Sequence, residues 1–198
     1  MYIEDNGHTP LSAQMVTLNV ALLKKNAPSD RFVIHTFNRS EAIKLVDLPR
    51  EWPGCDGACF SDLVRTAIMA QRGGIYIDAD VIVNKPLTQI ADDLKHFEIV
   101  SYASPGQQCT RGIFSSNFLA TRPGAVAYKR AFEAVKKKMK RKCYRDNTLV
   151  TCSIRWAEFG ELASHPITRE LAEQGKLAIK CYSGSESFTP HGNGHKYK

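Results

Sequence analysis

The chain has 198 residues, of which 43% are hydrophobic and 24% are charged, values ordinary for one soluble globular domain. No apolar run approaches the ~20 residues that a membrane-spanning helix needs, and residues 1–10 lack the pattern of a signal peptide. The net charge of +7 permits nucleic-acid binding but does not by itself indicate it.

Apolar spacing predicts a helix over residues 14–25, and the alternating, β-branched segment 31–37 predicts a strand. Ser40 is expected to cap a short helix, and residues 51–60 to form a loop. Ser61 then follows as the expected N-cap of a clear helix. The remaining predictions are a helix stop at residues 73–74, an extended segment at 75–83, strands at 97–102, 117–121 and 176–182, and helices at 123–141, 148–159 and 167–173.

The alternation of predicted strands and helices favours a single α/β domain over residues 1–198, with helices flanking a mixed, largely parallel sheet. Ligands of such sheets bind outside the carboxyl ends of the strands. Residues 78–80 lie where one predicted strand ends.

The six cysteines show no disulfide-framework spacing, and the pair Cys55 and Cys59 has no second Cys or His pair at a zinc-finger distance. We therefore expect mostly reduced thiols in a cytoplasmic protein. The basic run 136–145 is interpreted as the solvated end of a helix rather than as a nucleic-acid site, because no aromatic platform accompanies it.

In an extended segment Tyr76, Asp78 and Asp80 fall on one face, opposite Ile75, Ile77 and Ala79. Two carboxylates at this spacing repel each other unless a cation lies between them. Mg²⁺ and Mn²⁺ accept carboxylate ligands together with substrate phosphates. The spacing therefore indicates a metal–diphosphate site.

Asp62 and Arg65 are three residues apart on a predicted helix and share a face. They could form a surface ion pair, or they could meet the sugar and the phosphate oxygens of a ligand. The sequence leaves both readings open.

Residues 61–65 (SDLVR), 73–80 (GGIYIDAD) and 85–87 (KPL) together resemble the core of the sugar-binding DXD glycosyltransferases, among them capsular-polysaccharide sugar transferases and the fungal outer-chain mannosyltransferases of family 32. The resemblance implies a GT-A (Rossmann-like) fold, a nucleotide-sugar donor (UDP preferred over GDP), Mn²⁺ or Mg²⁺, and a glycan or glycoprotein acceptor. Short domains of this kind also occur in large DNA viruses of algae. A catalytic domain excised from a longer protein, host cytoplasm as the location and a capsid glycan as acceptor are therefore further expectations.

By position, the resemblance makes Arg65, Asp78 and Asp80 catalytic, with Asp80 on the metal directly and Asp78 on ribose or sugar and on the metal through water. Asp62 and Arg65 would hold the donor sugar and its phosphate end, and Tyr76 would line the donor pocket.

Residues 115–120 (SSNFLA), followed by 122–124 (RPG), are similar to a later segment of the same family, which would place Asn117 near the sugar. The tail 191–198 (HGNGHKYK) resembles the late motif in which a histidine ligates the metal and a lysine touches the diphosphate. His191 is favoured over His195 as the ligand, and Lys198 or Lys196 would be the lysine.

Three other functions fit parts of the sequence. A haloacid-dehalogenase-like phosphatase would use Asp78 as nucleophile and Asp80 as general acid, but its motif normally lies at the first strand. A non-catalytic nucleotide-sugar-binding module and a basic nucleic-acid-binding protein are the other two. An inverting transferase would also need a carboxylate base, for which Asp62, Asp146 and Glu158 are candidates, whereas a retaining one would not.

Overall fold

The computed structural model describes residues 10–103, 109–155 and 157–182. Its elements, in chain order, are α1 (Pro10–Asn26), α2 (Arg39–Leu45), the 3₁₀ turn η1 (Trp52–Gly54), α3 (Gly57–Gln71), β1 (Gly74–Ile77), α4 (Thr88–Asp93), β2 (Ile99–Tyr102), η2 (Cys109–Arg111), β3 (Phe118–Thr121), α5 (Val126–Lys142), β4 (Tyr144–Arg145), β5 (Thr148–Leu149), α6 (Glu161–Glu173) and β6 (Ile179–Tyr182).

Within the described residues the main sheet has four strands in the order β1-β3-β2-β6. Strand β3 runs antiparallel to both of its neighbours, and β2 runs parallel to β6. The predicted mixed α/β architecture is therefore confirmed. β1, β2 and β6 point the same way, but two of the three strand pairings are antiparallel because β3 is inserted between β1 and β2.

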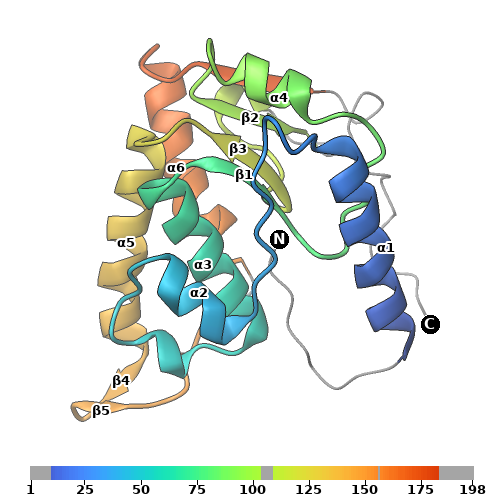
Figure 1. The fold of residues 1–198 in the computed structure, drawn as a ribbon. Coiled ribbons are helices and arrows are strands. Elements are labelled where there is room, and N and C mark those ends of the chain that lie inside the picture. Colours follow the sequence, from blue (N-terminus) through green and yellow to red (C-terminus); the bar gives the residue numbers. More distant parts are fainter. Residues whose placement is uncertain (1–9, 104–108, 156, 183–198) are drawn as a thin grey trace.

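Helices cover both faces of the sheet (Figure 1). Leu119 of β3 packs into a cluster with α3, α5 and α6, whereas its neighbours Phe118 and Ala120 pack into a second cluster with α1 and α4. Successive side chains of a strand point to opposite faces, so a strand buried on both sides belongs to two apolar layers. The sheet is thus the middle layer of a three-layer sandwich.

Two predicted helix starts are wrong, although both helices exist. The side chain of Asp56 accepts a hydrogen bond from the backbone N–H of Cys59 and caps α3, so Ser61 lies one turn inside the helix rather than at its N-cap. Asn38 caps α2 and forms a reciprocal capping box with Glu41, which leaves Ser40 within the helix. In both cases an Asp or Asn slightly upstream supplies the cap.

The predicted strand at residues 31–37 is not formed, apart from a single bridge residue at Phe37. A cavity of about 390 Å³ lies between this segment and β1, lined among others by residues 31–35 and 73–77. Val33 is 82% exposed. The alternating pattern is present, but an extended segment becomes a strand only when a neighbouring strand lies within hydrogen-bonding distance.

The predicted helix at residues 148–159 is also wrong. Asp146 and Asn147 have positive φ angles of 50° and 62°, and they join β4 to β5 as a two-residue hairpin turn. Such turns need positive φ at both central positions, which Asn and Asp tolerate better than most residues. The chain therefore reverses where the sequence analysis expected a helix to begin.

The expectation of reduced thiols is contradicted, because all six cysteines are paired in this structure. The disulfides are Cys55–Cys59, Cys109–Cys181 and Cys143–Cys152. Two of them link residues that no sequence motif relates, since their cysteines are brought together only by the fold.

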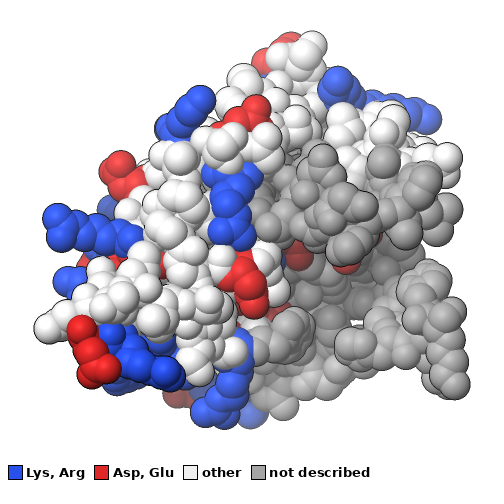
Figure 2. Space-filling model, turned by 90° about the horizontal axis from the view of Figure 1, so that it is seen from below, with Lys and Arg blue, Asp and Glu red and all other residues white. Residues whose placement is uncertain are grey.

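The basic run at residues 136–145 ends α5, as predicted. Lys138 and Lys142 pair with the buried Glu158, and Lys136 pairs with Glu133 one turn earlier. On the face seen in Figure 2, basic and acidic side chains are interspersed. No helix in the described part of the chain is long and apolar enough to cross a membrane.

Candidate active site at the end of strand β1

The candidate site lies where β1 ends. Ile77 of β1 pairs with Phe118 of β3, and the next residue, Asp78, donates its backbone N–H to the carbonyl of Asn117 at 2.8 Å. The chain then turns, with the N–H of Val81 bonded to the carbonyl of Asp78 at 3.1 Å. This turn presents Asp80 to solvent, while the sheet pairing fixes the backbone of Asp78.

Arg65 lies at the centre of the site and is only 6% exposed. Its Nη1 donates to Asp62 Oδ1 at 3.1 Å and to Ser116 Oγ at 2.6 Å, and its Nη2 donates to both carboxylate oxygens of Asp78 at 3.0 and 3.2 Å. The helix-face pairing of Asp62 with Arg65 is therefore present. It is not the exposed surface pair that was the alternative reading, because both side chains are mostly buried.

Tyr76 lies beneath Arg65. Its ring centroid is 5.0 Å from the guanidinium carbon of Arg65, and its hydroxyl is 3.4 Å from Ser61 Oγ. The predicted alternation is confirmed for Tyr76, which belongs to the cluster facing α3, and for Ile77, which belongs to the opposite one. It does not extend to Asp80, because the strand ends at Ile77 and the chain turns at residues 79–80. Tyr76 is only 1% exposed, so its ring packs against Arg65 and leaves little surface for the predicted contact with a donor.

Two further residues belong to the site although the sequence analysis did not single them out. Glu161, at the start of α6, accepts hydrogen bonds from both the backbone N–H and the hydroxyl of Ser116 at 3.2 Å. Ser116 stands beside Asn117 in the SSN motif, which could have identified it. Nothing in the sequence around Glu161 indicates a place in the site, since only the packing of α6 against α5 and η2 brings it there. We call Asp62, Arg65, Asp78, Ser116 and Glu161 the Arg65 cluster.

Gly160 forms one wall of this cluster. A Cβ atom at Gly160 would lie 2.6 Å from Asp62 Oδ1, closer than van der Waals contact allows. The hydroxyl of Thr66 donates to the carbonyls of Asp62 and Phe159 and so joins α3 to the segment that leads into α6. The carboxylate of Asp62 is therefore held between Arg65 and a backbone that only glycine permits.

The Arg65 cluster contains more carboxylates than cations, and this excess of negative charge affects the pKa values of its members. Burial, with further contributions from Asp78 and Glu161, raises the pKa of Asp62 to about 6 in spite of the Arg65 charge. Burial and repulsion by Asp80 also raise the pKa of Asp78. Burial disfavours the charge on Arg65, but the nearby carboxylates outweigh it and raise the pKa of Arg65 above its ordinary value. Asp62 and Asp78 thus share one cation, while Glu161 is linked to Arg65 only through Ser116.

This excess of carboxylate fits a divalent cation, since Mg²⁺ and Mn²⁺ take oxygen ligands. Asp80 is exposed, so its oxygens are accessible for direct coordination. Both oxygens of Asp78 are hydrogen-bonded to Arg65, which suits an indirect contact better. Arg65 Nε is buried without a hydrogen-bond partner among the described residues.

Asn117 is partly buried beside Asp78, and its side-chain oxygen accepts hydrogen bonds from Tyr102 and Ser115 at 2.7 and 2.9 Å. His191, His195, Lys196 and Lys198 lie outside the described residues. The other base candidates lie elsewhere: Asp146 is in the β4–β5 hairpin, and Glu158 is bonded to Lys142 and to the backbone N–H of Arg155.

Helix α1 contacts the turn from the opposite side. Asn19 is fully buried, and its amide donates to the carbonyl of Ala79, between the two aspartates, at 2.5 Å. Two helical turns later, Asn26 donates to the carbonyl of Val83 at 2.8 Å. The carboxyl end of β1 is therefore fixed by β3 on one side and by α1 on the other.

Comparison with protein families gives one match: the model described as a glycosyltransferase sugar-binding region containing a DXD motif matches residues 2–97, just under half of the chain. The match includes Asp62, Arg65, Asp78 and Asp80, and it ends before β2. No curated protein and no solved structure was found to match the chain. Residues 2–97 are thus similar to a glycosyltransferase sugar-binding region with a DXD motif.

Proposed function

We propose that the protein transfers a sugar from a nucleotide-sugar donor to a hydroxyl group of a glycan or glycoprotein. The observation that carries the proposal is the Arg65 cluster, in which one buried cation is shared by Asp62 and Asp78 directly below the turn that exposes Asp80. The family match to a sugar-binding region supports the same conclusion.

In this proposal the donor diphosphate approaches the end of β1 and Arg65 faces its phosphate oxygens. Charge-assisted hydrogen bonds from the Arg65 guanidinium would strengthen as the leaving diphosphate gains charge. Asp62, held against Gly160, would accept hydrogen bonds from the sugar hydroxyls. Asn117 lies on the adjacent strand end, within reach of the same ligand.

A Mn²⁺ or Mg²⁺ ion bound by Asp80 would supply further stabilisation of the leaving diphosphate. Asp78 would hold the turn through Arg65 and contact the ion through water. His191 is proposed as an additional ligand, and Lys198 as a diphosphate contact. Asp62 is the candidate base that lies within the cluster, so an inverting reaction would use it, whereas a retaining reaction needs no such base.

The finer parts of the proposal are a GT-A arrangement of the whole domain, UDP in preference to GDP, and an acceptor such as a viral capsid glycan. A cytoplasmic location, in a virus-infected host or otherwise, is also a proposal. Paired cysteines are typical of oxidising compartments, so the redox state of the thiols in the protein isolated from its source would test that location.

The first experiment is calorimetric titration of UDP, then GDP, into the protein with Mn²⁺ and with EDTA. We expect binding of UDP only with metal, followed by turnover of a UDP-sugar from a donor panel. Asp80→Ala should lower metal-dependent affinity at least tenfold, about 1.4 kcal/mol, with an unchanged circular dichroism spectrum.

Asp47→Ala is the matched control. Asp47 is exposed, and it contacts Gln71 through its backbone, so the substitution should leave UDP affinity unchanged. If Asp80→Ala binds UDP as the wild type does, the metal site is wrongly placed. If neither nucleotide binds in either buffer, the transferase proposal fails, and phosphate release from phosphomonoesters would test the phosphatase alternative.

A further inference from the structure

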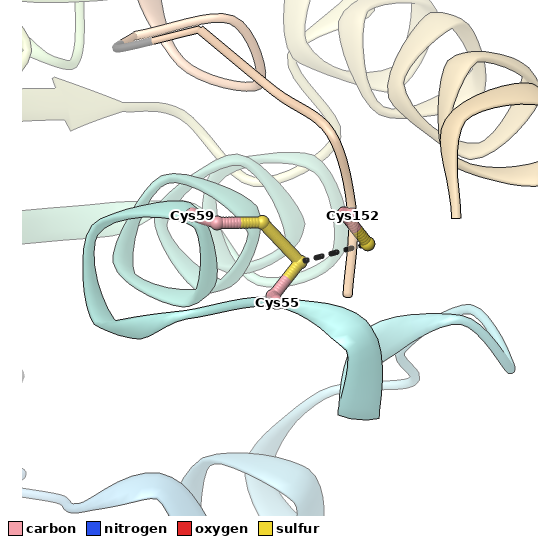
Figure 3. Close-up of side chains that lie close together, drawn as sticks. All are labelled: Cys55, Cys59 and Cys152. Atoms are coloured by element: carbon pink, nitrogen blue, oxygen red, sulfur yellow. Dashed lines mark hydrogen bonds between the residues drawn. A yellow bond between two sulfur atoms is a disulfide. The ribbon is translucent and has the colours of Figure 1, made fainter. Parts of the chain in front are cut away.

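Cys55, Cys59 and Cys152 meet in one buried group, and Cys143 is joined to this group by its disulfide with Cys152. Cys55 precedes α3 and Cys59 lies in its first turn, whereas Cys143 caps the end of α5 and Cys152 follows β5. The sulfur atoms of Cys55, Cys59 and Cys152 all lie within 4.8 Å of one another. Figure 3 shows these three side chains converging, with Cys55 Sγ 4.0 Å from Cys152 Sγ.

This arrangement is close to the geometry of a structural zinc site. With four sulfur ligands at about 2.3 Å in a tetrahedron, neighbouring sulfur atoms lie roughly 3.8 Å apart. The separation of 4.0 Å between Cys55 and Cys152, two residues 97 positions apart in the chain, is near that value. Cys143 lies outside that group of three, but its bond to Cys152 places a fourth sulfur directly beside the group. All four side chains are buried, as in closed structural sites.

The backbone around the cluster also suits it. The N–H of Cys152 donates to the carbonyl of Gly54 at 2.7 Å, and a Cβ atom at Gly54 would lie 3.0 Å from Cys152 Sγ. Glycine at this position therefore lets the loop before Cys55 approach the sulfur of a residue far away in sequence. The two halves of the cluster are held together by main-chain contact as well as by sulfur.

Some of the surrounding charges favour thiolates, although Cys143 lies at the negative C-terminal end of α5 and Lys142 is paired with Glu158. A zinc ion with four cysteine thiolates carries a net charge of −2, which nearby cations stabilise. The last turn of α5, directly before Cys143, contains Lys140, Arg141 and Lys142. Cys59 lies at the N-terminal end of α3, where the helix dipole stabilises negative charge.

We propose that Cys55, Cys59, Cys143 and Cys152 bind one structural zinc ion when their thiols are reduced. The disulfides Cys55–Cys59 and Cys143–Cys152 and the zinc site are then two states of one cluster. A thiol reductant supplies four electrons and four protons to convert the two disulfides into four thiols. Zinc binding then releases protons as thiolates form.

The zinc site would order the helix that carries the active site. Asp62 and Arg65 lie three and six residues after Cys59 in α3. Zinc would join the start of α3 to the end of α5 and to the segment after the β4–β5 hairpin. The inference does not depend on the transferase proposal, because zinc content is measured without any nucleotide.

The test is Co²⁺ and Zn²⁺ binding by the full chain, purified without oxygen in a phosphine reductant. We expect one zinc per chain by elemental analysis. With Co²⁺ we expect thiolate-to-cobalt charge-transfer absorption and the visible bands of tetrahedral cobalt. Asp80→Ala should keep these bands, which separates the cluster from the carboxylate site. Cys59→Ser and Cys152→Ser should each weaken metal binding at least tenfold.

Cys109→Ser/Cys181→Ser is the matched control, because this pair lies outside the cluster, and it should keep the cobalt spectrum. The proposal is overturned if the fully reduced wild-type protein gives no thiolate–cobalt absorption, or if the control pair loses it as completely as Cys59→Ser does. The wild-type spectrum is decisive even if a cluster variant fails to fold.

Discussion

At the scale of single residues, Asp62 shows how the site combines burial with unbalanced charge. Its carboxylate is mostly removed from water, walled in by Gly160, and shares Arg65 with Asp78. One cation cannot compensate several buried carboxylates, so the protonated form of Asp62 gains relative to the ionised form. A ligand or ion that brings positive charge or hydrogen-bond donors would remove this cost. In the ligand-free protein the ionised carboxylate of Asp62 is therefore destabilised, and binding of a ligand or ion can reduce this free-energy cost.

This leads to a prediction about pH in metal-free buffer. The pKa of Asp62 is raised from 3.8 to about 6 in the folded protein, so the folded state binds this proton more tightly than the unfolded state. The resulting stability is fully present below pH 3.8 and is lost as the pH rises through 6. Asp62→Asn should therefore become more stable than the wild type by roughly 1–3 kcal/mol above pH 6.

Urea unfolding of both proteins between pH 4 and pH 8 measures the difference directly. The variant should also lose donor affinity, because the amide cannot accept hydrogen bonds in the same way. A difference in unfolding free energy that stays constant across this range would contradict the buried, charge-coupled environment described for Asp62.

At the scale of elements, helix α1 positions the turn between Asp78 and Asp80. Asn19→Ala removes the hydrogen bond to the carbonyl of Ala79, so the turn should lose its support on that side. We expect Mn²⁺-dependent UDP affinity to fall about tenfold, and stability to fall by about 1–3 kcal/mol. Calorimetry and urea unfolding of the same preparation give both values.

Asn26→Ala is the control for this prediction. Asn26 lies on the same helix and also donates to a carbonyl of the segment after β1, but that carbonyl belongs to Val83, beyond the turn. The Asn26→Ala substitution should lower the free energy of unfolding by a similar amount and leave UDP affinity unchanged. Equal losses of affinity in both variants would show that α1 acts on the site only through general stability.

The elements that could be predicted from the sequence are those whose signals are local. The helix that became α3 and the strand β1 follow from apolar periodicity and from Gly73-Gly74, and the Asp78–Asp80 pair follows from its place after the strand. The helix expected at 148–159 failed because Asp146 and Asn147 adopt positive φ. The strand expected at 31–37 failed because strand pairing depends on a distant partner.

At the scale of the whole molecule, the contacts that could not be predicted are those between distant segments. Glu161 reaches Ser116 only because α6 packs on α5, which packs on α3, and Arg65 becomes buried only when these helices cover the sheet. The cysteine pairs have the same origin. Composition and spacing favoured free thiols, whereas the fold brings Cys109 and Cys181 together across 72 residues. The resemblance to a sugar-binding region could thus be found from local motifs, but the environment of the site could not.

The Cys109–Cys181 bridge gives a prediction at this scale. It joins η2 to β6, the last strand in the order of the main sheet. Closing a loop of 72 residues removes entropy from the unfolded chain worth about 4 kcal/mol in the chain-entropy model, and measured values are commonly 2–4 kcal/mol. Cys109→Ser/Cys181→Ser should therefore lower the free energy of unfolding by about 2–4 kcal/mol in oxidising buffer.

In reducing buffer the wild type lacks the same constraint, so the two proteins should unfold at nearly equal urea concentrations. The other four cysteines are unchanged in the variant, so their contribution cancels from the comparison in each buffer. Equal stability in oxidising buffer would mean that the bridge does not form in solution. A difference that persists after complete reduction would mean that Cys109 and Cys181 stabilise the fold by packing, since both side chains lie in or against the apolar cluster that faces α3, α5 and α6.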